Sequence, residues 1–140
     1  MKITEHFSLV EFTQSDTAES KGIDNTPDEK TIENIKHLCI EVLEPLRRYV
    51  DQPVVISSGY RSKALNKAVG GVRNSQHMTG EAADIKGNKD QLREWMAWIM
   101  DNCRFDQLIL EHNKAGLYWI HVSYSTKHNR QCVISSILKK

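Results

Sequence analysis

The residues best suited to chemistry in this sequence are two histidines and an aspartate. His77 leaves a polar loop, and Asp84 follows it within the apolar segment 82–85. An ionised carboxylate in such a segment is costly to bury unless it is paired or bound to a metal. His121 lies far downstream in a second apolar segment. Two imidazoles and one carboxylate form a suitable ligand set for one zinc ion (Zn2+) per chain, with a fourth position left for water.

A hydrolytic zinc site also needs a proton acceptor and a cation. Glu111 ends an apolar segment, and the hairpin expected after it would return the chain to His121. We therefore expect Glu111 to accept the proton of the attacking water and to donate it later. Arg61 follows another apolar segment, and its guanidinium can bind an oxyanion or a substrate carboxylate. Trp119 shares a strand face with His121, because side chains alternate along a strand, and is expected to line the substrate cleft.

Each of these residues also has an ordinary structural interpretation. A single histidine or aspartate in a strand is more often a hydrogen-bonded structural residue than a ligand, but three at this spacing favour a metal site. Arg61 alternatively braces a turn, and Glu111 alternatively ends its strand in solvent. The residue types alone leave these alternatives open.

Helical patterns occupy the first third of the chain. The spacing of a capping box predicts helices that begin at Ser8 and at Thr26, where Pro27 would take the first helical position. Apolar residues then recur at helical spacing over 32–46, so one face of that helix is expected to be buried. Pro45 is expected to kink this helix or to end its regular part.

Strand patterns dominate the later part of the chain. Two further helices are expected, over 62–69 and after the predicted cap Asn88. Strands are predicted over 53–57, 82–86, 107–111, 118–124 and near 131–134. Helices that precede a mainly antiparallel sheet place the chain in the α+β class. The length of 140 residues fits a single domain, residues 1–140.

The composition argues against several other functions. The formal net charge is +1 and the basic residues are scattered, so we expect neither a nucleic-acid partner nor a membrane surface. Three widely spaced cysteines form no CxxC pair and indicate neither a disulfide framework nor a thiolate zinc site. No apolar run approaches the length of a membrane span, and the first residues are too polar for a secretory signal. We therefore expect a protein made in the cytoplasm, with a monomer as the default for this size.

The motif Ser75-x-His77-x-x-Gly80-x-Ala82-x-Asp84, with His121 in a Trp-x-His-Val-Ser setting, resembles a family of metallopeptidases. These are the lysostaphin, D-Ala-D-Ala peptidase and hedgehog types. The chain is most similar to the D-Ala-D-Ala carboxypeptidase branch, which includes phage endolysins that cut L-Ala-D-Glu bonds and which carries segments like 58–62 and 66–71.

This resemblance implies a hedgehog- or D,D-peptidase-like fold, in which N-terminal helices pack on a small, mainly antiparallel sheet. It implies that the two histidines and Asp84 bind zinc and that Arg61 stabilises charge in the transition state. Ser75 matches a position that helps to hold the substrate in dipeptidase relatives. A hydrogen bond within the loop is the other role open to Ser75.

The catalytic acid is the one place where the sequence departs from several relatives. They carry it three residues before the last histidine ligand, where this chain has Tyr118. The hedgehog signalling domain instead has a Phe-Asp strand that ends in glutamate, and the segment Phe105–Glu111 is similar to it. We therefore assign the catalytic role to Glu111.

The expected function is zinc-dependent hydrolysis of an amide bond in peptidoglycan stem peptides, with those peptides as partners. The resemblance is compatible with a D-Ala-D-Ala carboxypeptidase, a dipeptidase or an L-Ala-D-Glu endopeptidase. A chain without a signal peptide would reach the cell wall when lysis releases it, as a phage endolysin does. The alternative is a module that contains zinc but only binds the wall or a partner.

Overall fold

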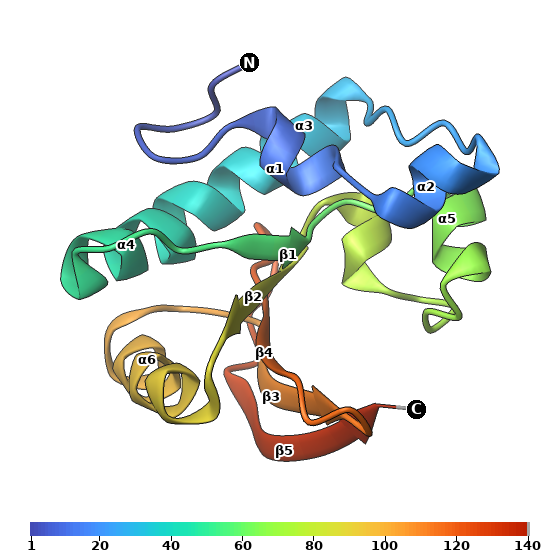
Figure 1. Ribbon diagram of the computed structural model, residues 1–140. Coiled ribbons are helices and arrows are strands. Elements are labelled where there is room, and N and C mark those ends of the chain that lie inside the picture. The colour runs from blue at the N-terminus through green and yellow to red at the C-terminus, as the bar shows by residue number, and fades with distance from the viewer. Residues whose placement is uncertain (140) are drawn as a thin grey trace.

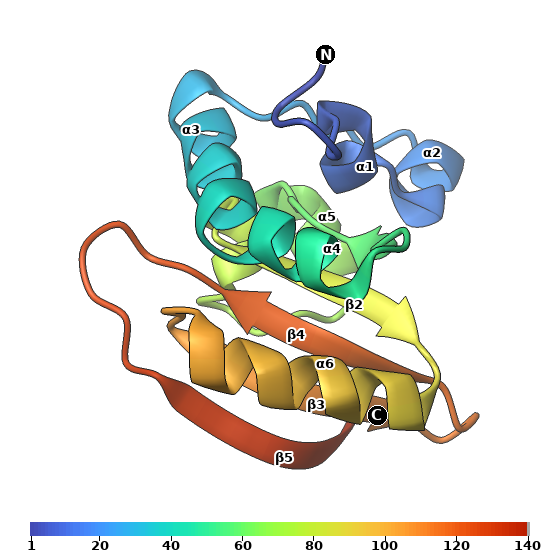
Figure 2. The ribbon, with the colours of Figure 1, turned by 90° about the vertical axis from the view of Figure 1, so that its left-hand side faces the viewer.

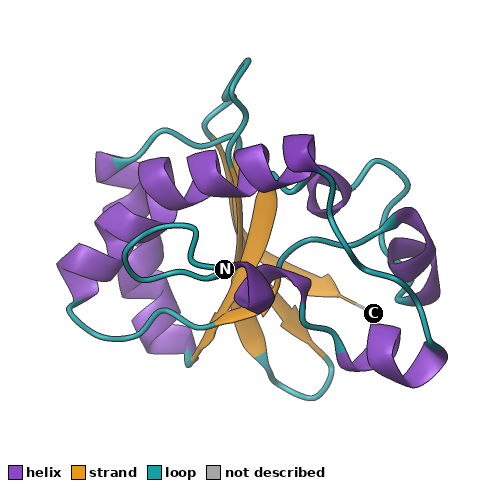
Figure 3. Cartoon of the chain, turned by 90° about the horizontal axis from the view of Figure 1, so that it is seen from above, coloured by secondary structure: helices purple, strands orange, loops and turns teal. Residues whose placement is uncertain are grey.

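Helices lie on both sides of a five-stranded sheet in the computed structural model, which describes residues 1–139 (Figure 1, Figure 3). The helices are α1 (Leu9–Thr13), α2 (Asp16–Lys21), α3 (Glu29–Leu38), α4 (Glu44–Val50), α5 (Lys63–Ala68) and α6 (Lys89–Asn102). The strands are β1 (Ile56–Ser58), β2 (Ala82–Gly87), β3 (Gln107–Asn113), β4 (Tyr118–Ser123) and β5 (Cys132–Lys139). The predicted α+β class is confirmed.

The sheet has the strand order β1-β2-β4-β3-β5. Strand β1 pairs with β2, β2 with β4 and β4 with β3, all antiparallel. Strand β5 runs parallel to β3 along one edge of the sheet (Figure 2). The sheet is therefore mainly antiparallel, as predicted. The strand expected near 131–134 is longer than predicted, because its pairing with β3 continues as far as Lys139.

One face of the sheet forms the hydrophobic core together with α3, α4 and α6. Figure 2 shows α6 lying along β3 and β4. Alternate strand residues face this layer and are fully buried: Leu108, Leu110, Ile120 and Val122. The residues between them face the opposite side, where polar groups gather. Among the described residues, no helix has both the length and the apolar character that a bilayer span requires.

One of the two predicted capping boxes is present. The Ser8 backbone N–H donates to the Glu11 carboxylate at 2.7 Å, which confirms the first. The helix start predicted at Thr26 is wrong. Asp28 caps α3 instead, because its carboxylate accepts the backbone N–H of Thr31 at 2.8 Å and satisfies a donor of the first turn.

The disturbance expected at Pro45 takes the form of a change in helix type. A π-helical segment, Cys39–Leu43, joins α3 to α4, and Pro45 lies in the first turn of α4. Proline lacks a backbone N–H and its ring crowds the preceding turn, and a wider turn relieves both effects. The helix continues, so Leu43 and Leu46 both remain fully buried.

Candidate metal centre

Strands β2 and β4 place Asp84 beside His121. These two residues are direct partners in the antiparallel register, on the face of the sheet away from the core. Their neighbours Ile85 and Ile120 are also paired and are fully buried on the core face. The alternation predicted from the sequence therefore brings one carboxylate and one imidazole together.

His77 reaches the same point from a 3-10 helix, Gln76–Thr79, that precedes β2. Gly80 ends this helix with a φ of 77°, and a Cβ atom there would lie 2.6 Å from the carbonyl oxygen of Thr31. The Nδ1 atom of His77 lies 2.6 Å from the carbonyl oxygen of Gly59. Because a carbonyl only accepts, Nδ1 carries the proton in this contact, and Nε2 is left as a free ligand atom.

Three ligand atoms converge at this point. His77 Nε2 lies 3.2 Å from Asp84 Oδ1, and His121 Nδ1 lies 3.1 Å from the same oxygen. The three ligand atoms, one from each residue, all lie within 4.8 Å of one another. Two imidazole nitrogens and a carboxylate oxygen, with His77 oriented by a backbone carbonyl, fit a zinc ion. The three residues predicted as ligands are thus brought together.

The electrostatics of Asp84 also suit a cation. Burial by itself raises the pKa of Asp84, but the charges and hydrogen bonds of His77 and His121 outweigh burial. The pKa of Asp84 therefore lies well below its usual range, and the carboxylate stays ionised. An ionised carboxylate among two imidazoles attracts a divalent cation.

Arg61 lies beside the three ligands and is held by its neighbours. Its guanidinium donates to Asn66 Oδ1 at 3.0 Å, and its Nη2 lies 4.0 Å from Asp84 Oδ2. Gly71 leaves the space for this pair, since a Cβ atom there would lie 2.1 Å from Asn66 Oδ1. Burial lowers the pKa of Arg61, and the charges of Asp84 and Glu111 oppose that shift. Arg61 thus braces a loop and also faces the site.

Glu111 lies on the same face of the sheet, opposite Trp119 in the register of β3 and β4. Its carboxylate is buried, with 6% of the residue exposed. Oε1 accepts the indole N–H of Trp119 at 2.7 Å, and Oε2 lies 3.4 Å from Nζ of Lys139 in β5. Glu111 therefore does not end its strand in solvent, and its orientation is set by Trp119.

A cavity of about 990 Å³ joins these side chains. The three ligands, Arg61, Glu111, Trp119 and Ser75 all line it. Ser75 Oγ accepts the backbone N–H of His77 at 3.1 Å, so this hydroxyl caps the 3-10 helix. Ser75 therefore makes the loop hydrogen bond, and its contact with substrate stays a prediction.

Tyr118 lies outside the cavity. It stacks on His112, with ring centroids 5.0 Å apart, and Nζ of Lys89 lies 5.5 Å from its ring. These contacts lie on the other side of the sheet from Glu111 and Trp119, because side chains alternate along β3 and β4. The geometry therefore favours Glu111 over Tyr118 as the proton-transfer residue.

Two supporting groups were missed by the sequence interpretation. The Gly59 carbonyl, which orients His77, is a backbone group, and no residue pattern predicts its position. Lys139 reaches Glu111 only because β5 pairs in parallel with β3, and parallel pairing leaves no local signal. Asn66, which positions Arg61, was part of a recognised motif but had no assigned role.

Two comparisons relate this chain to known proteins. The model of a family described as Peptidase M15 matches residues 5–123, which include all the site residues described above except Lys139. A stretch of 35 residues is 49% identical to a zinc D-Ala-D-Ala carboxypeptidase of Streptomyces albus G and covers 25% of this chain. The match spans only 14% of that relative's length. Because the family model matches most of its residues, the chain belongs to the peptidase M15 family.

Proposed function

We propose that this protein hydrolyses an amide bond in bacterial peptidoglycan stem peptides with the help of zinc. The observation that carries the proposal is the convergence of three ligand atoms in one cavity with a buried carboxylate and a guanidinium. Membership of the peptidase M15 family supports hydrolysis of a peptide bond. The named activity of the Streptomyces relative supports wall peptides as the substrate class.

In this proposal, His77, Asp84 and His121 hold the zinc ion. Zinc bound there would supply a Lewis acid that lowers the pKa of water and polarises the substrate carbonyl. Glu111, which Trp119 holds through Oε1, would accept the proton of the attacking water. Glu111 then gives this proton to the departing amine.

Arg61 is proposed to bind the oxygen on which negative charge develops. Its Nη1 and Nε atoms already donate to Asn66 and Ser58, so the guanidinium is fixed before substrate arrives. A donor that is already in place needs no reorganisation during the reaction, which is the main source of oxyanion stabilisation. Trp119 would act as a wall of the cleft and as the group that orients Glu111.

The bond that is cut is either D-Ala-D-Ala or L-Ala-D-Glu in this proposal. Among the described residues, four cationic side chains line the cavity and together can attract a substrate carboxylate: Arg61, Lys114, Arg130 and Lys139. The name of the Streptomyces relative favours the D-Ala-D-Ala bond. We further propose that the protein meets the wall when a cell lyses, as a phage endolysin does.

The test is digestion of purified cell wall by the zinc-loaded and the metal-free protein. New amino termini and free D-alanine, formed only with zinc, would identify a D-Ala-D-Ala carboxypeptidase. New amino termini of D-glutamate would identify an L-Ala-D-Glu endopeptidase. A protein that sediments with the wall but releases no termini would contradict hydrolysis and support the alternative of a zinc-containing binding module.

A further inference from the structure

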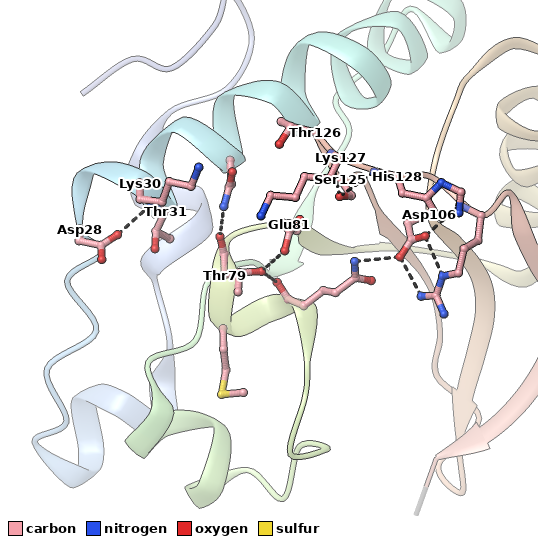
Figure 4. A pocket seen from close by; sticks show the side chains of 14 residues that line it. Asp28, Lys30, Thr31, Thr79, Glu81, Asp106, Ser125, Thr126, Lys127 and His128 are labelled. Carbon is pink, nitrogen blue, oxygen red and sulfur yellow. Dashed lines mark hydrogen bonds and ion pairs between the residues drawn. The ribbon is translucent and has the colours of Figure 1, made fainter.

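A second cavity, of about 620 Å³, is shown in Figure 4, and it shares lining residues with the metal-site cavity. Its walls come from the first turns of α3, from the 3-10 helix before β2, and from the loop 125–130. Gln76 and Arg130 line both cavities. The two spaces therefore adjoin at these two side chains.

Asp106 fixes the boundary between the two cavities. Its carboxylate accepts the side-chain amide of Gln76 at 3.0 Å and the Arg130 guanidinium through two contacts of 2.8 Å. It also accepts the backbone N–H of Arg130 at 2.9 Å, which ties the loop to the sheet. Asp106 itself is buried. The boundary is thus built from charged and polar groups in fixed positions.

The Gln76 side chain carries an unused acceptor at this boundary. Its Nε2 donates to Asp106, whereas its buried Oε1 has no hydrogen-bond partner among the described residues. Reversing the amide would place Oε1 against the Asp106 carboxylate, so the orientation is set by charge. A buried acceptor without a donor is unfavourable, and an N–H donor of a ligand would relieve that cost.

Charges of both signs surround the second cavity. Glu81 and Lys127 point into it in Figure 4, and Lys30 also lines it. Neither lysine forms an ion pair with another described residue. A cavity with both signs and an unused acceptor suits a polar peptide segment better than an apolar ligand or a polyanion.

We propose that the second cavity binds a side branch of the substrate peptide that ends in an ammonium group. An N–H of this group donates to Gln76 Oε1, with Glu81 nearby to balance its charge, while the main chain of the peptide continues to the metal centre. The inference rests on the proposed function, because it deepens the substrate class of the same site. The loop 125–130 follows residue 123, where the family match ends, so this wall is not part of the matched region.

The direct test is a binding measurement with two wall-type peptides that differ at one residue, lysine in one and norleucine in the other. The Glu111→Gln protein is used with zinc, so that peptide is not consumed, and NMR shifts of the backbone and the Gln76 amide are followed. We expect the lysine peptide to bind about tenfold more tightly and to shift Gln76 and residues 125–128. Equal affinities, or shifts confined to the metal-site cavity, would overturn the proposal.

A pair of variants tests whether the preference for lysine arises in this cavity or at the carboxylates of the metal site. Thr126→Trp fills the second cavity from its exposed rim, and Ser20→Trp places the same side chain at an exposed position on α2 that lines neither cavity. Thr126→Trp should reduce the preference for lysine to less than about twofold, and Ser20→Trp should retain the tenfold preference. A preference that survives in Thr126→Trp would contradict the assigned cavity.

Cleavage of the same peptides by the zinc-loaded wild type distinguishes this inference from the proposed function. A lysine preference in binding without cleavage of either peptide would support the cavity and refute hydrolysis of these peptides. Cleavage of both peptides with equal kcat/KM and equal affinity would support hydrolysis and refute the cavity.

Discussion

On strand β4, Ile120 and Val122 are fully buried in the core, whereas Trp119 and His121 line the metal-site cavity. Strand β3 repeats this division, with Leu110 in the core beside Glu111 in the cavity. The core face is held by apolar packing and the site face by directed hydrogen bonds. Residues adjacent in sequence thus serve different purposes, so substitutions on the two faces should separate stability from chemistry.

The largest effect is expected on the site face, at Glu111. Glu111→Gln keeps the size of the side chain but removes the proton acceptor, so kcat/KM should fall by about 10²- to 10⁴-fold. The free energy of unfolding should change by less than about 1 kcal/mol, because the amide oxygen can still accept from Trp119. Peptide hydrolysis and urea unfolding measure the two quantities.

The matched control is Glu94→Gln, an exposed position on α6, which should change neither quantity. Full activity in Glu111→Gln would refute Glu111 as the base. A loss of stability as large as the loss of activity would show that the two faces are not separable at this position.

The reverse result is expected on the core face, at Ile120. Ile120→Ala leaves a cavity among fully buried side chains and should lower the free energy of unfolding by about 2–5 kcal/mol. Zinc content of the folded protein should stay unchanged, although Ile120 adjoins His121. Val133→Ala in β5 should lower the free energy of unfolding far less, because Val133 is 38% exposed. If Ile120→Ala lost zinc while its stability stayed unchanged, the contrast between the core face and the site face would be wrong.

The next effect concerns the charged boundary at Asp106, and it depends on pH. Hydrogen bonds from Arg130 lower the pKa of Asp106 from 3.8 to about 2. Because the folded pKa lies below the unfolded one, the stabilisation is complete above pH 3.8 and disappears as the pH falls towards 2. Asp106→Asn should therefore be less stable by about 2 kcal/mol at pH 6, and the difference should shrink towards pH 2.

Unfolding curves of the wild type and Asp106→Asn at pH 6, 4 and 2 would measure this dependence. A stability difference that stays constant over this range would show that the Asp106 charge contributes nothing, and that only its shape matters. Such a result would also weaken the description of the cavity boundary as electrostatically fixed.

The smallest effect is expected for the group that orients Glu111. Trp119→Phe removes the indole N–H that donates to Oε1 but keeps an aromatic wall, so kcat/KM should fall about tenfold. Trp98→Phe is the control, because Trp98 stacks on Tyr49 with ring centroids 4.8 Å apart and lines neither cavity. Equal activity of the two variants would remove Trp119 from the account of how Glu111 is held.

The success of the sequence interpretation follows the same division between the faces. Strand alternation is a local property, so the shared face of Trp119 and His121 could be predicted from residue order, and both line the cavity. The ligand motif spans a loop, a glycine turn and a strand whose geometry depends on neighbouring residues. These features were therefore predictable.

Features that depend on distant segments were not predictable in the same way. The start of α3 was placed wrongly because Thr26 and Asp28 both offer plausible caps, and only the folded backbone decides between them. The full length of β5 and the contact of Lys139 with Glu111 depend on parallel pairing across the chain. The second cavity arises from three separate segments, so no local pattern announces it.

Zinc content tests the central claim most directly. Purified protein, assayed by elemental analysis beside His77→Ala, His121→Ala and His112→Ala, should contain about one zinc per chain in the wild type. His112→Ala is the matched control, because His112 adjoins Glu111 but stacks on Tyr118 on the opposite side of the sheet. The account predicts that His112→Ala keeps the metal and that the other two variants lose it. Absence of zinc uptake by the wild type, or equal zinc in all four proteins, would contradict the assigned centre.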